Sequence, residues 1–271
     1  MKSILLHVHD DLGLESRLRA ACDIARATNG HIHCVQISAM PDFVAADMYG
    51  GAGLAPEMLA DLDEMDETVR LRTQERLTRE GVGWDWRHLR ADTVRGLLAS
   101  AGLSDLLVVT LPHGPRKDYR DPEPIAAELV LASRVPVMAV PQDARALDVP
   151  GRALVAWDGS EESSTALRLA LPLLKLADDV HVVTVAEEGK PVFPATDPVE
   201  YLSRHGIKSE LHSWPREGRT VDAALNAAIA ALKPDWMAMG AFGHSRLRQF
   251  VLGGVTRTML RQADLPLLLA H

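Results

Sequence analysis

The chain contains only two cysteines among its 271 residues. Cys22 and Cys34 are too few for a disulfide framework or for a cysteine-based zinc site. The opening MKSILLHVHDD becomes charged too early for the apolar segment of a secretory signal peptide. No apolar run reaches the roughly 18 residues that a membrane-spanning helix needs. These absences predict a cytoplasmic protein that does not span a membrane.

The chain also lacks any long run of lysine and arginine, and its formal net charge is −8. The residues are 47% hydrophobic and 24% charged, which is an ordinary globular composition. Nucleic acids and anionic membrane surfaces bind concentrated positive patches. The composition therefore argues against nucleic acid and membrane as principal partners, and it favours a small ligand or another protein.

Two halves of the sequence repeat the same order of patterns. ILLHVHDDLGLESRLRAACDIARATNGHIHCVQIS near the start and ALVAWDGSEESSTALRLALPLLKLADDVHVVTVAE from Ala153 both indicate a strand, an acidic turn, a helix and a strand. SDLLVVTLPHG corresponds in the same way to PDWMAMGAFGH, and SRVPVMAVP to ADLPLLLAH. PQDARALDVPGR, between the halves, has the prolines, glycine and mixed charges of a linker. We therefore predict two domains, residues 1–143 and 150–271.

Each half carries five apolar or β-rich runs separated by helical patterns. In the first half the runs are Ile4–His9, His31–Ile37, Trp84–Leu89, Leu106–Thr110 and Val135–Val140. In the second half they are Ala153–Trp157, Val180–Val185, Ile207–Trp214, Trp236–Gly240 and Leu265–Ala270. Strands that are apolar on both faces and alternate with helices indicate a parallel sheet covered on both sides. The predicted fold class is α/β, with two doubly wound five-stranded parallel sheets and long loops at Ala39–Met58 and Glu187–Pro198.

Glycines cluster after the fourth run of the second half, in GAFGHSRLRQFVLGGVTRTML. The pattern is formed by Gly240, Gly243, Gly253, Gly254 and Val255. In a doubly wound sheet the ligand lies beyond the carboxyl ends of the strands, where Asp158 ends the first run and Gly240 the fourth. The next helix would begin near the glycine pair, and a helix start offers unpaired N–H donors and a partial positive charge. We therefore expect an anionic ligand here, most simply a nucleotide. The alternative is that the glycines only relieve crowding and that Asp158 caps the following helix.

These residues carry a resemblance. GAFGHSRLRQFVLGGVTRTMLRQADLPLLLAH resembles the closing segment of the universal stress protein family, whose nucleotide-binding members show G-x2-G-x9-G-[S/T] before a helix and a short apolar strand. Gly240, Gly243 and Gly253 match in identity and spacing. With the duplication, the whole chain resembles a tandem universal stress protein. The resemblance implies two flavodoxin-like (adenine nucleotide alpha hydrolase-like) domains, joined as an internal pseudo-dimer by pairing of VPVMAVP with LPLLLAH.

The resemblance also implies a ligand and its contacts. The ligand would be ATP or another adenine nucleotide, with or without Mg²⁺, and the adenine would contact Asp158 and Val185. Ribose and phosphates would lie against Gly240, Gly243, Gly253, Gly254 and Val255. Gly254 departs from the motif, because it stands where Ser or Thr would bond a phosphate. One lost neutral hydrogen bond is worth about 0.5–1.5 kcal/mol, so we expect affinity to fall by roughly tenfold.

The first half lacks this motif. At the corresponding positions it has Thr110, His113, Glu123 and Pro124. No glycine cradle remains, and a glutamate would repel phosphates, so we expect this half to have lost nucleotide binding and to serve as a structural or regulatory partner.

The first half is also rich in histidine. We expect packing or surface roles for His7, His9, His31 and His33 because His31 begins its strand whereas His9 ends the other, so the four should not converge. Strand ends one and four would instead bring His9, Asp10 and His113 together, which leaves open a zinc site.

Catalytic motifs are missing: the sequence has no G-x-x-x-x-G-K-[ST], G-x-S-x-G or H-E-x-x-H. No positioned general base is evident, so enzymatic activity is uncertain and at most weak ATP hydrolysis is expected. The resemblance implies a stress-response protein that acts through a nucleotide-dependent change in conformation or partner. A stress scaffold without nucleotide and a slow ATPase are the alternatives, and protein partners and a homodimer remain open.

Overall fold

The computed structural model describes residues 1–38, 56–114, 117–118, 120–185, 196–243 and 254–271. Its strands form one ten-stranded sheet in the order β3-β2-β1-β4-β5-β10-β9-β6-β7-β8. The strands of half one are β1 Ser3–Val8, β2 His31–Ser38, β3 Gly83–Arg90, β4 Leu106–Leu111 and β5 Val137–Pro141. Those of half two are β6 Arg152–Ala156, β7 Asp179–Val185, β8 Glu210–Trp214, β9 Trp236–Gly240 and β10 Leu267–Ala270.

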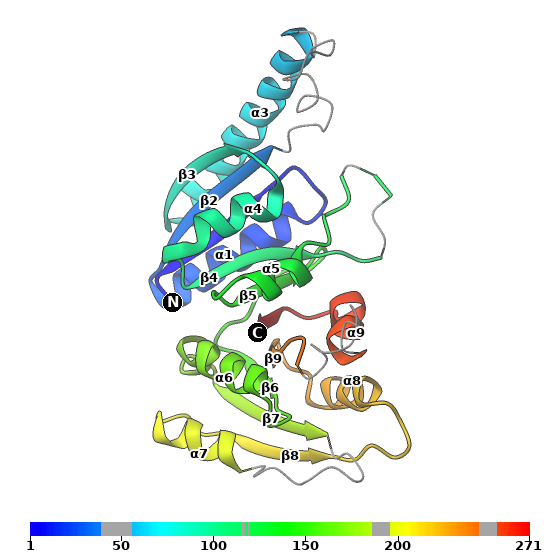
Figure 1. Cartoon of the computed structure of the whole chain (residues 1–271). Coiled ribbons are helices and arrows are strands. Elements are labelled where there is room, and N and C mark those ends of the chain that lie inside the picture. Colours follow the sequence, from blue (N-terminus) through cyan, green and yellow to red (C-terminus); the bar gives the residue numbers. More distant parts are fainter. Residues whose placement is uncertain (39–55, 115–116, 119, 186–195, 244–253) are drawn as a thin grey trace.

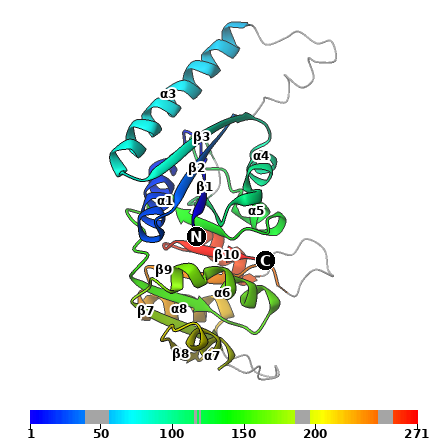
Figure 2. The same ribbon diagram turned by 90° about the vertical axis from the view of Figure 1, so that its left-hand side faces the viewer.

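Helices cover both faces of this sheet (Figures 1 and 2). One face carries α1 Leu14–Thr28, α3 Pro56–Glu80, α6 Glu161–Leu174 and α7 Asp197–Arg204. The other carries α4 Thr93–Ser100, α5 Ala126–Ala132, α8 Val221–Leu232 and α9 Gly254–Gln262, with the short 3₁₀ turn η1 Ala101–Leu103 after α4. Successive residues of a strand therefore point into two separate cores, as Leu5 and Leu6 of β1 do.

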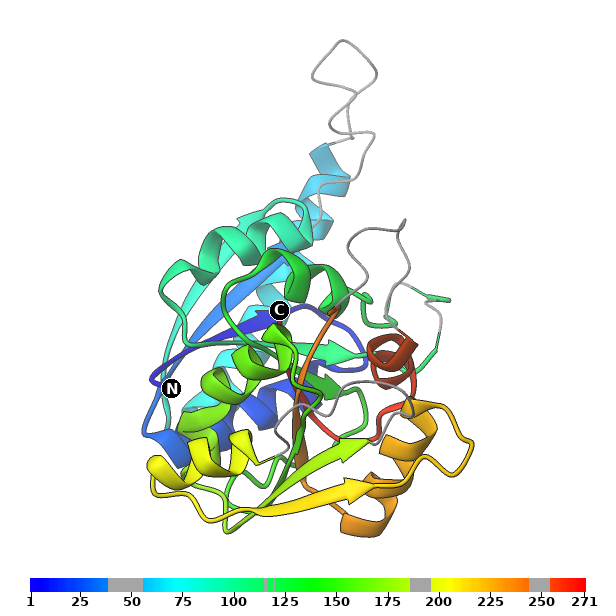
Figure 3. The same ribbon diagram turned by 60° about the horizontal axis from the view of Figure 1, so that its bottom comes forward.

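The apolar sequence of the strands explains their place in the sheet. Every residue of β4, β5 and β10 is buried, because these strands lie centrally and are covered on both faces. The outermost strands β3 and β8 are polar and partly exposed, and Figure 3 shows β8 at its edge beside β7. Edge strands with charged side chains resist pairing with other chains.

Each half has the same topology. The order is β3-β2-β1-β4-β5 in half one and, by equivalent strands, β8-β7-β6-β9-β10 in half two. All pairs within a half are parallel. β5 and β10 pair antiparallel, with Leu268 opposite Met138, and so join the halves edge to edge. The predicted fold class is confirmed, and the two five-stranded sheets form one continuous sheet.

A repeated hydrogen-bond pattern at the amino ends of the strands shows the equivalence of the halves. Asp105 Oδ2, before β4, accepts from the backbone N–H groups of Lys2 and Ser3 at 2.5 and 3.1 Å. Asp235 Oδ2, before β9, accepts from the N–H of Arg152 at 2.7 Å. Each aspartate therefore fixes the start of its neighbouring strand, and both stand one residue before an apolar strand.

The expected loops differ in extent from the structure. The predicted loop Ala39–Met58 overlaps α3, which begins at Pro56, and Glu187–Pro198 overlaps the start of α7. The greater part of both segments lies outside the described residues. None of the helices that the structure describes is long and apolar enough to cross a membrane.

Candidate functional site

A cavity of about 200 Å³ lies at the carboxyl ends of β6 and β9. These two strands are parallel neighbours, as the predicted ligand position requires. The cavity is bordered also by the end of β7 and by the starts of α6, α8 and α9. Its lining includes the predicted residues Asp158, Val185, Gly240, Gly243, Gly254 and Val255. The seventh predicted residue, Gly253, lies outside the described residues.

Asp158 shapes the start of α6 without capping it. Its Oδ1 accepts from the Ser160 backbone N–H at 3.0 Å and from the Ser160 hydroxyl at 2.5 Å. Ser160 is the N-cap, since its Oγ accepts from Ser163 N–H at 3.1 Å. The suggestion that Asp158 itself caps the helix is therefore wrong: Asp158 holds the cap in place and remains exposed at the cavity.

Gly240 is a glycine because α6 begins against it. A Cβ at this position would lie 2.4 Å from Ser163 N and 2.5 Å from the carbonyl carbon of Glu162. Gly243 is less crowded, because the nearest atom to its Cβ would be Glu162 Oε2 at 2.9 Å. Gly254, at the start of α9, would meet no atom of the described residues within 4 Å. Close packing thus explains Gly240, and Gly254 is left without a packing reason.

Several residues that line the cavity were not among the predicted ones. They are Trp157, Ser160, Glu162 and Thr256, with apolar neighbours from β7, α8 and β9. The indole N–H of Trp157 is buried and has no partner among the described residues. The helical register after the N-cap could have indicated Glu162, because a residue in the first turn of α6 faces the end of β9.

The loop between Gly240 and Gly243 is held in an unusual conformation. Phe242 has φ 63°, in the left-handed region that costs a non-glycine residue roughly 1–2 kcal/mol. Its side chain is buried, and its N–H donates to Thr256 Oγ1 at 3.3 Å. Thr256 thereby ties the first turn of α9 to the loop after β9.

The electrostatics of the lining are asymmetric. Asp158 and Glu162 contribute carboxylates, and the described lining residues include no lysine or arginine. Among the described lining residues, attraction for an anion comes from the helix starts that border the cavity, those of α6, α8 and α9. A phosphate group here would therefore bind helix N–H groups beside two negative charges.

The corresponding region of half one is built differently. Asp11 Oδ1 accepts from Gly13 N–H at 2.8 Å, as Asp158 does from Ser160. In half one the glycine of the helix–strand contact is Gly13, which precedes α1. A Cβ on Gly13 would lie 2.4 Å from Cγ2 of Thr110 in β4. The buried Arg17 donates to Thr110 Oγ1 and to the carbonyl oxygens of His7 and His9. In half two the glycine, Gly240, lies at the end of the strand, whereas in half one the glycine, Gly13, lies at the start of the helix and the strand carries Thr110.

His9, Asp10 and His113 are not among the described groups of potential metal ligands whose donor atoms lie within 4.8 Å of one another. Asp10 pairs with Arg72 at 2.6 Å, and His113 Nε2 lies 2.9 Å from Asp143 Oδ1. The hypothesis of a zinc site at these three residues is therefore wrong. The expectation that the four histidines of β1 and β2 should not converge is confirmed: His7 stacks on His9 within β1, and His31 approaches His33 on β2, with ring centroids 5.0 Å apart.

Comparison with known proteins places the second half in a family. Residues 151–271 match the model of the universal stress protein family. Universal stress protein Slr1230 from Synechocystis is 28% identical over 121 residues, which cover 43% of this chain and 41% of that protein. The match thus spans less than half the length of this relative.

Solved structures resemble the whole fold. A universal stress protein from Archaeoglobus fulgidus superposes with a TM-score of 0.78 at 17% identity, covering 99% of this chain and 97% of that one. The functionally unknown protein PA1789 from Pseudomonas aeruginosa gives a TM-score of 0.61 at 18% identity, covering 100% and 92%. At these identities the likeness extends to the fold of both halves. The match to the universal stress protein family model thus covers the second half of the chain, residues 151–271.

Proposed function

We propose that half two binds an adenine nucleotide, and that the chain is a stress-response protein that acts through a nucleotide-dependent conformation or partner. One observation carries the proposal. Residues from separate segments of the sequence line a single cavity at the meeting point of β6 and β9, namely Asp158, Val185, Gly240, Gly243, Gly254 and Val255.

The cavity itself is suited to part of a nucleotide. A volume of about 200 Å³ is below the roughly 300–1,000 Å³ of pockets that enclose a complete drug-sized ligand. Val183, Val185 and Leu225 supply apolar surface, and Trp157 is a further lining residue whose buried indole N–H has no partner in the described part of the chain. In our proposal the base occupies this apolar part, and the ribose and phosphates extend along the start of α9.

The two carboxylates make a divalent cation part of the proposal. Asp158 and Glu162 would repel ATP phosphates unless their charge is neutralised, and Mg²⁺ bound to the phosphates does this. Chelation of Mg²⁺ should therefore weaken ATP binding more than adenosine binding.

The direct test is nucleotide content and affinity. The purified protein is denatured, released nucleotide is identified by chromatography, and ATP with Mg²⁺ is titrated calorimetrically into the emptied protein. Gly243→Glu places a third carboxylate at the cavity and should abolish binding. Gly102→Glu is the matched control, because a Cβ on Gly102 meets nothing within 4 Å and the residue lies in half one. Absence of bound nucleotide and of binding in the parent protein would contradict the proposal.

A scaffold without nucleotide is the second candidate, and one observation favours it. Gly240 is required for the packing of α6, so this glycine by itself does not indicate a ligand. A slow ATPase is the third candidate. It predicts turnover that Asp158→Ala removes while ATP binding persists.

We also propose that half one is a second domain of the same kind, with boundaries near 1–143 and 150–271. The equivalent topology and the paired Asp105 and Asp235 contacts support this. A homodimer, protein partners and a cytoplasmic location stay predictions.

A further inference from the structure

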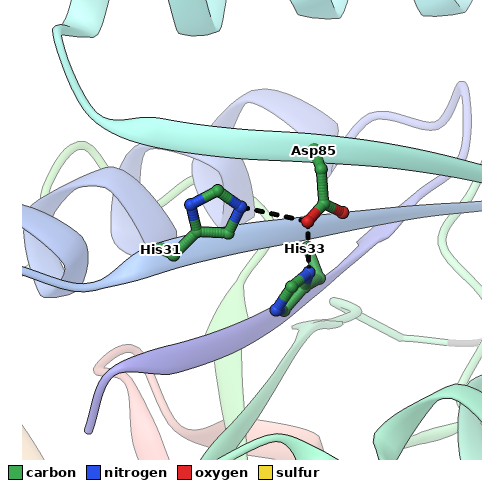
Figure 4. A group of neighbouring side chains, drawn as sticks. All are labelled: His31, His33 and Asp85. Carbon is green, nitrogen blue, oxygen red and sulfur yellow. Dashed lines mark hydrogen bonds and ion pairs between the residues drawn. The ribbon is translucent and has the colours of Figure 1, made fainter.

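A cluster of two histidines and one aspartate lies on the outer strands of half one. His31 and His33 are the first and third residues of β2, and Asp85 of β3 is the register partner of His33. His31 Nε2 lies 3.0 Å and His33 Nδ1 2.7 Å from the same oxygen, Asp85 Oδ2 (Figure 4). The side chains are 44, 41 and 54% exposed, so solvent and ions reach them.

A second cluster lies on the outer strands of half two. His181 of β7 is the register partner of Glu210 on β8, and His212 follows two residues later on the same face. His181 Nδ1 lies 2.8 Å from His212 Nε2 and 3.7 Å from Glu210 Oε2. His212 Nε2 lies 3.8 Å from the same oxygen.

The two clusters occupy equivalent places in the repeat. His33 and His181 are each the third residue of the second strand of their half, and each stands opposite an acidic residue of the edge strand, Asp85 or Glu210. The remaining imidazole comes from His31 of the second strand in half one and from His212 of the edge strand in half two. The two halves thus reach the same donor set, two imidazoles and one carboxylate, by different residues.

The donor atoms are close enough to share one ion. Ligands of a tetrahedral Zn²⁺, bound at about 2.0–2.1 Å, lie about 3.3 Å from one another. The three separations in half two, 2.8, 3.7 and 3.8 Å, bracket this value. In half one the two measured separations are 0.3 to 0.6 Å shorter, a difference that exposed side chains can absorb.

A carboxylate outside the cluster, that of Asp179, orients His181. His181 Nε2 lies 3.1 Å from Asp179 Oδ2, which also accepts from Arg152 Nε at 3.0 Å. A proton on Nε2 leaves the lone pair of His181 Nδ1 directed at His212 and Glu210. A carboxylate behind a histidine commonly fixes the tautomer of a metal ligand in this way.

We propose that each half of the chain carries one site for a divalent transition-metal ion, formed by His31, His33 and Asp85 in half one and by His181, Glu210 and His212 in half two. Two imidazoles and a carboxylate suit Zn²⁺ and its neighbours and not Mg²⁺ or Ca²⁺, which prefer oxygen ligands. Water reaches the exposed Asp85 and Glu210 and completes the coordination. Both sites lie near the amino ends of their strands and are distinct from the cavity beside Gly240, at the carboxyl ends.

The test counts metal ions in the full chain without nucleotide. Zn²⁺ is titrated calorimetrically, bound metal is measured after gel filtration, and Co²⁺ absorption reports the ligand field. We expect two ions per chain, His33→Gln and His212→Gln each to remove one, and the double variant to remove both. His205→Gln is the control, because His205 is exposed and belongs to neither cluster.

The proposal is overturned if the parent chain takes up no Zn²⁺, or if both variants take up as much Zn²⁺ as the parent chain. Loss of an ion from only one variant overturns the assignment of the other half. Circular dichroism of the variants separates loss of a ligand from loss of the fold, and Mg²⁺ in place of Zn²⁺ should give no saturable signal.

Discussion

The guanidinium of Arg17 lies 2.5 Å from the carboxylate of Asp11, and the two side chains are 0 and 2% exposed. Removing one member of a buried ion pair leaves the other charge without its partner, at a cost of about 3–5 kcal/mol. We expect Arg17→Met to lower the free energy of unfolding by this amount, measured by urea denaturation at pH 7. Arg19→Met, which breaks a surface pair with Glu15, should cost less than about 1 kcal/mol. An equal loss of unfolding free energy in the two variants would contradict a stabilising role for the buried Arg17–Asp11 pair.

Gly240 and Gly254 should respond differently to alanine. A methyl group at Gly240 would overlap backbone atoms of α6, and overpacking of this kind costs about 1–3 kcal/mol. At Gly254 the methyl group meets no atom in the part of the chain that the structure describes, so Gly254→Ala should change stability by less than about 0.5 kcal/mol or increase it slightly. Thermal and urea denaturation measure the stability of the two variants. A Gly240→Ala protein as stable as its parent would contradict the close approach of α6 to Gly240.

Gly254→Ser restores the hydroxyl of the universal stress protein motif. If nucleotide binds as proposed, we expect ATP affinity to rise about tenfold, the equivalent of one hydrogen bond. Gly254→Ala changes the backbone in the same way without adding a donor. Calorimetric titration of both variants isolates the hydroxyl, and equal affinities would place the phosphates elsewhere.

Asp105 should contribute stability that depends on pH. The backbone N–H of Lys2, helped by that of Ser3, lowers the pKa of Asp105 in the folded chain. A carboxylate with a lowered folded pKa stabilises the protein above its unfolded pKa of about 3.9 and loses this effect at lower pH. Asp105→Ala should therefore cost about 1 kcal/mol at pH 7 and progressively less below about pH 4. Urea denaturation at several pH values tests this, and parallel curves for parent and variant would refute it.

The two cysteines should be unreactive in the folded protein. Burial raises the pKa of Cys22 to about 11 and that of Cys34 further. The thiolate is the reacting species, so little is present at pH 8. We expect mass spectrometry to find no alkylation by iodoacetamide in the native chain and two modifications after denaturation. Alkylation of the native chain at the denatured rate would indicate that this part of α1 and β2 opens.

The inner strands were predictable because burial on both faces leaves a clear apolar run, whereas the edge strands β3 and β8 gave weaker, β-rich patterns. All ten strands lie where the sequence predicted them, within a few residues. Helix α3 gave a weak signal, since Val69, Thr73 and Leu77 are its buried positions among the side chains that the structure describes, and nearly half of its residues are charged. Its start at Pro56 therefore fell inside an expected loop.

The arrangement of the candidate site was predictable in outline and not in its packing. The motif and the strand order predicted that Asp158 and Gly240 would meet. The reason for Gly240 depends on how closely α6 approaches β9, which no single-sequence pattern encodes. The Asp85 contact with His31 and His33 was missed for a related reason, because it depends on the register between β2 and β3.

The antiparallel pair of β5 and β10 makes the unfolding of one half a cost to the other. Val137, Met138 and Ala139 face Leu267, Leu268 and Leu269, and all six side chains are withdrawn from water. Loss of half two would leave β5, a fully apolar strand, paired only with β4 and with its other edge exposed. Melting should therefore be a single cooperative transition, and a ligand held in either half should raise the midpoint for the entire chain.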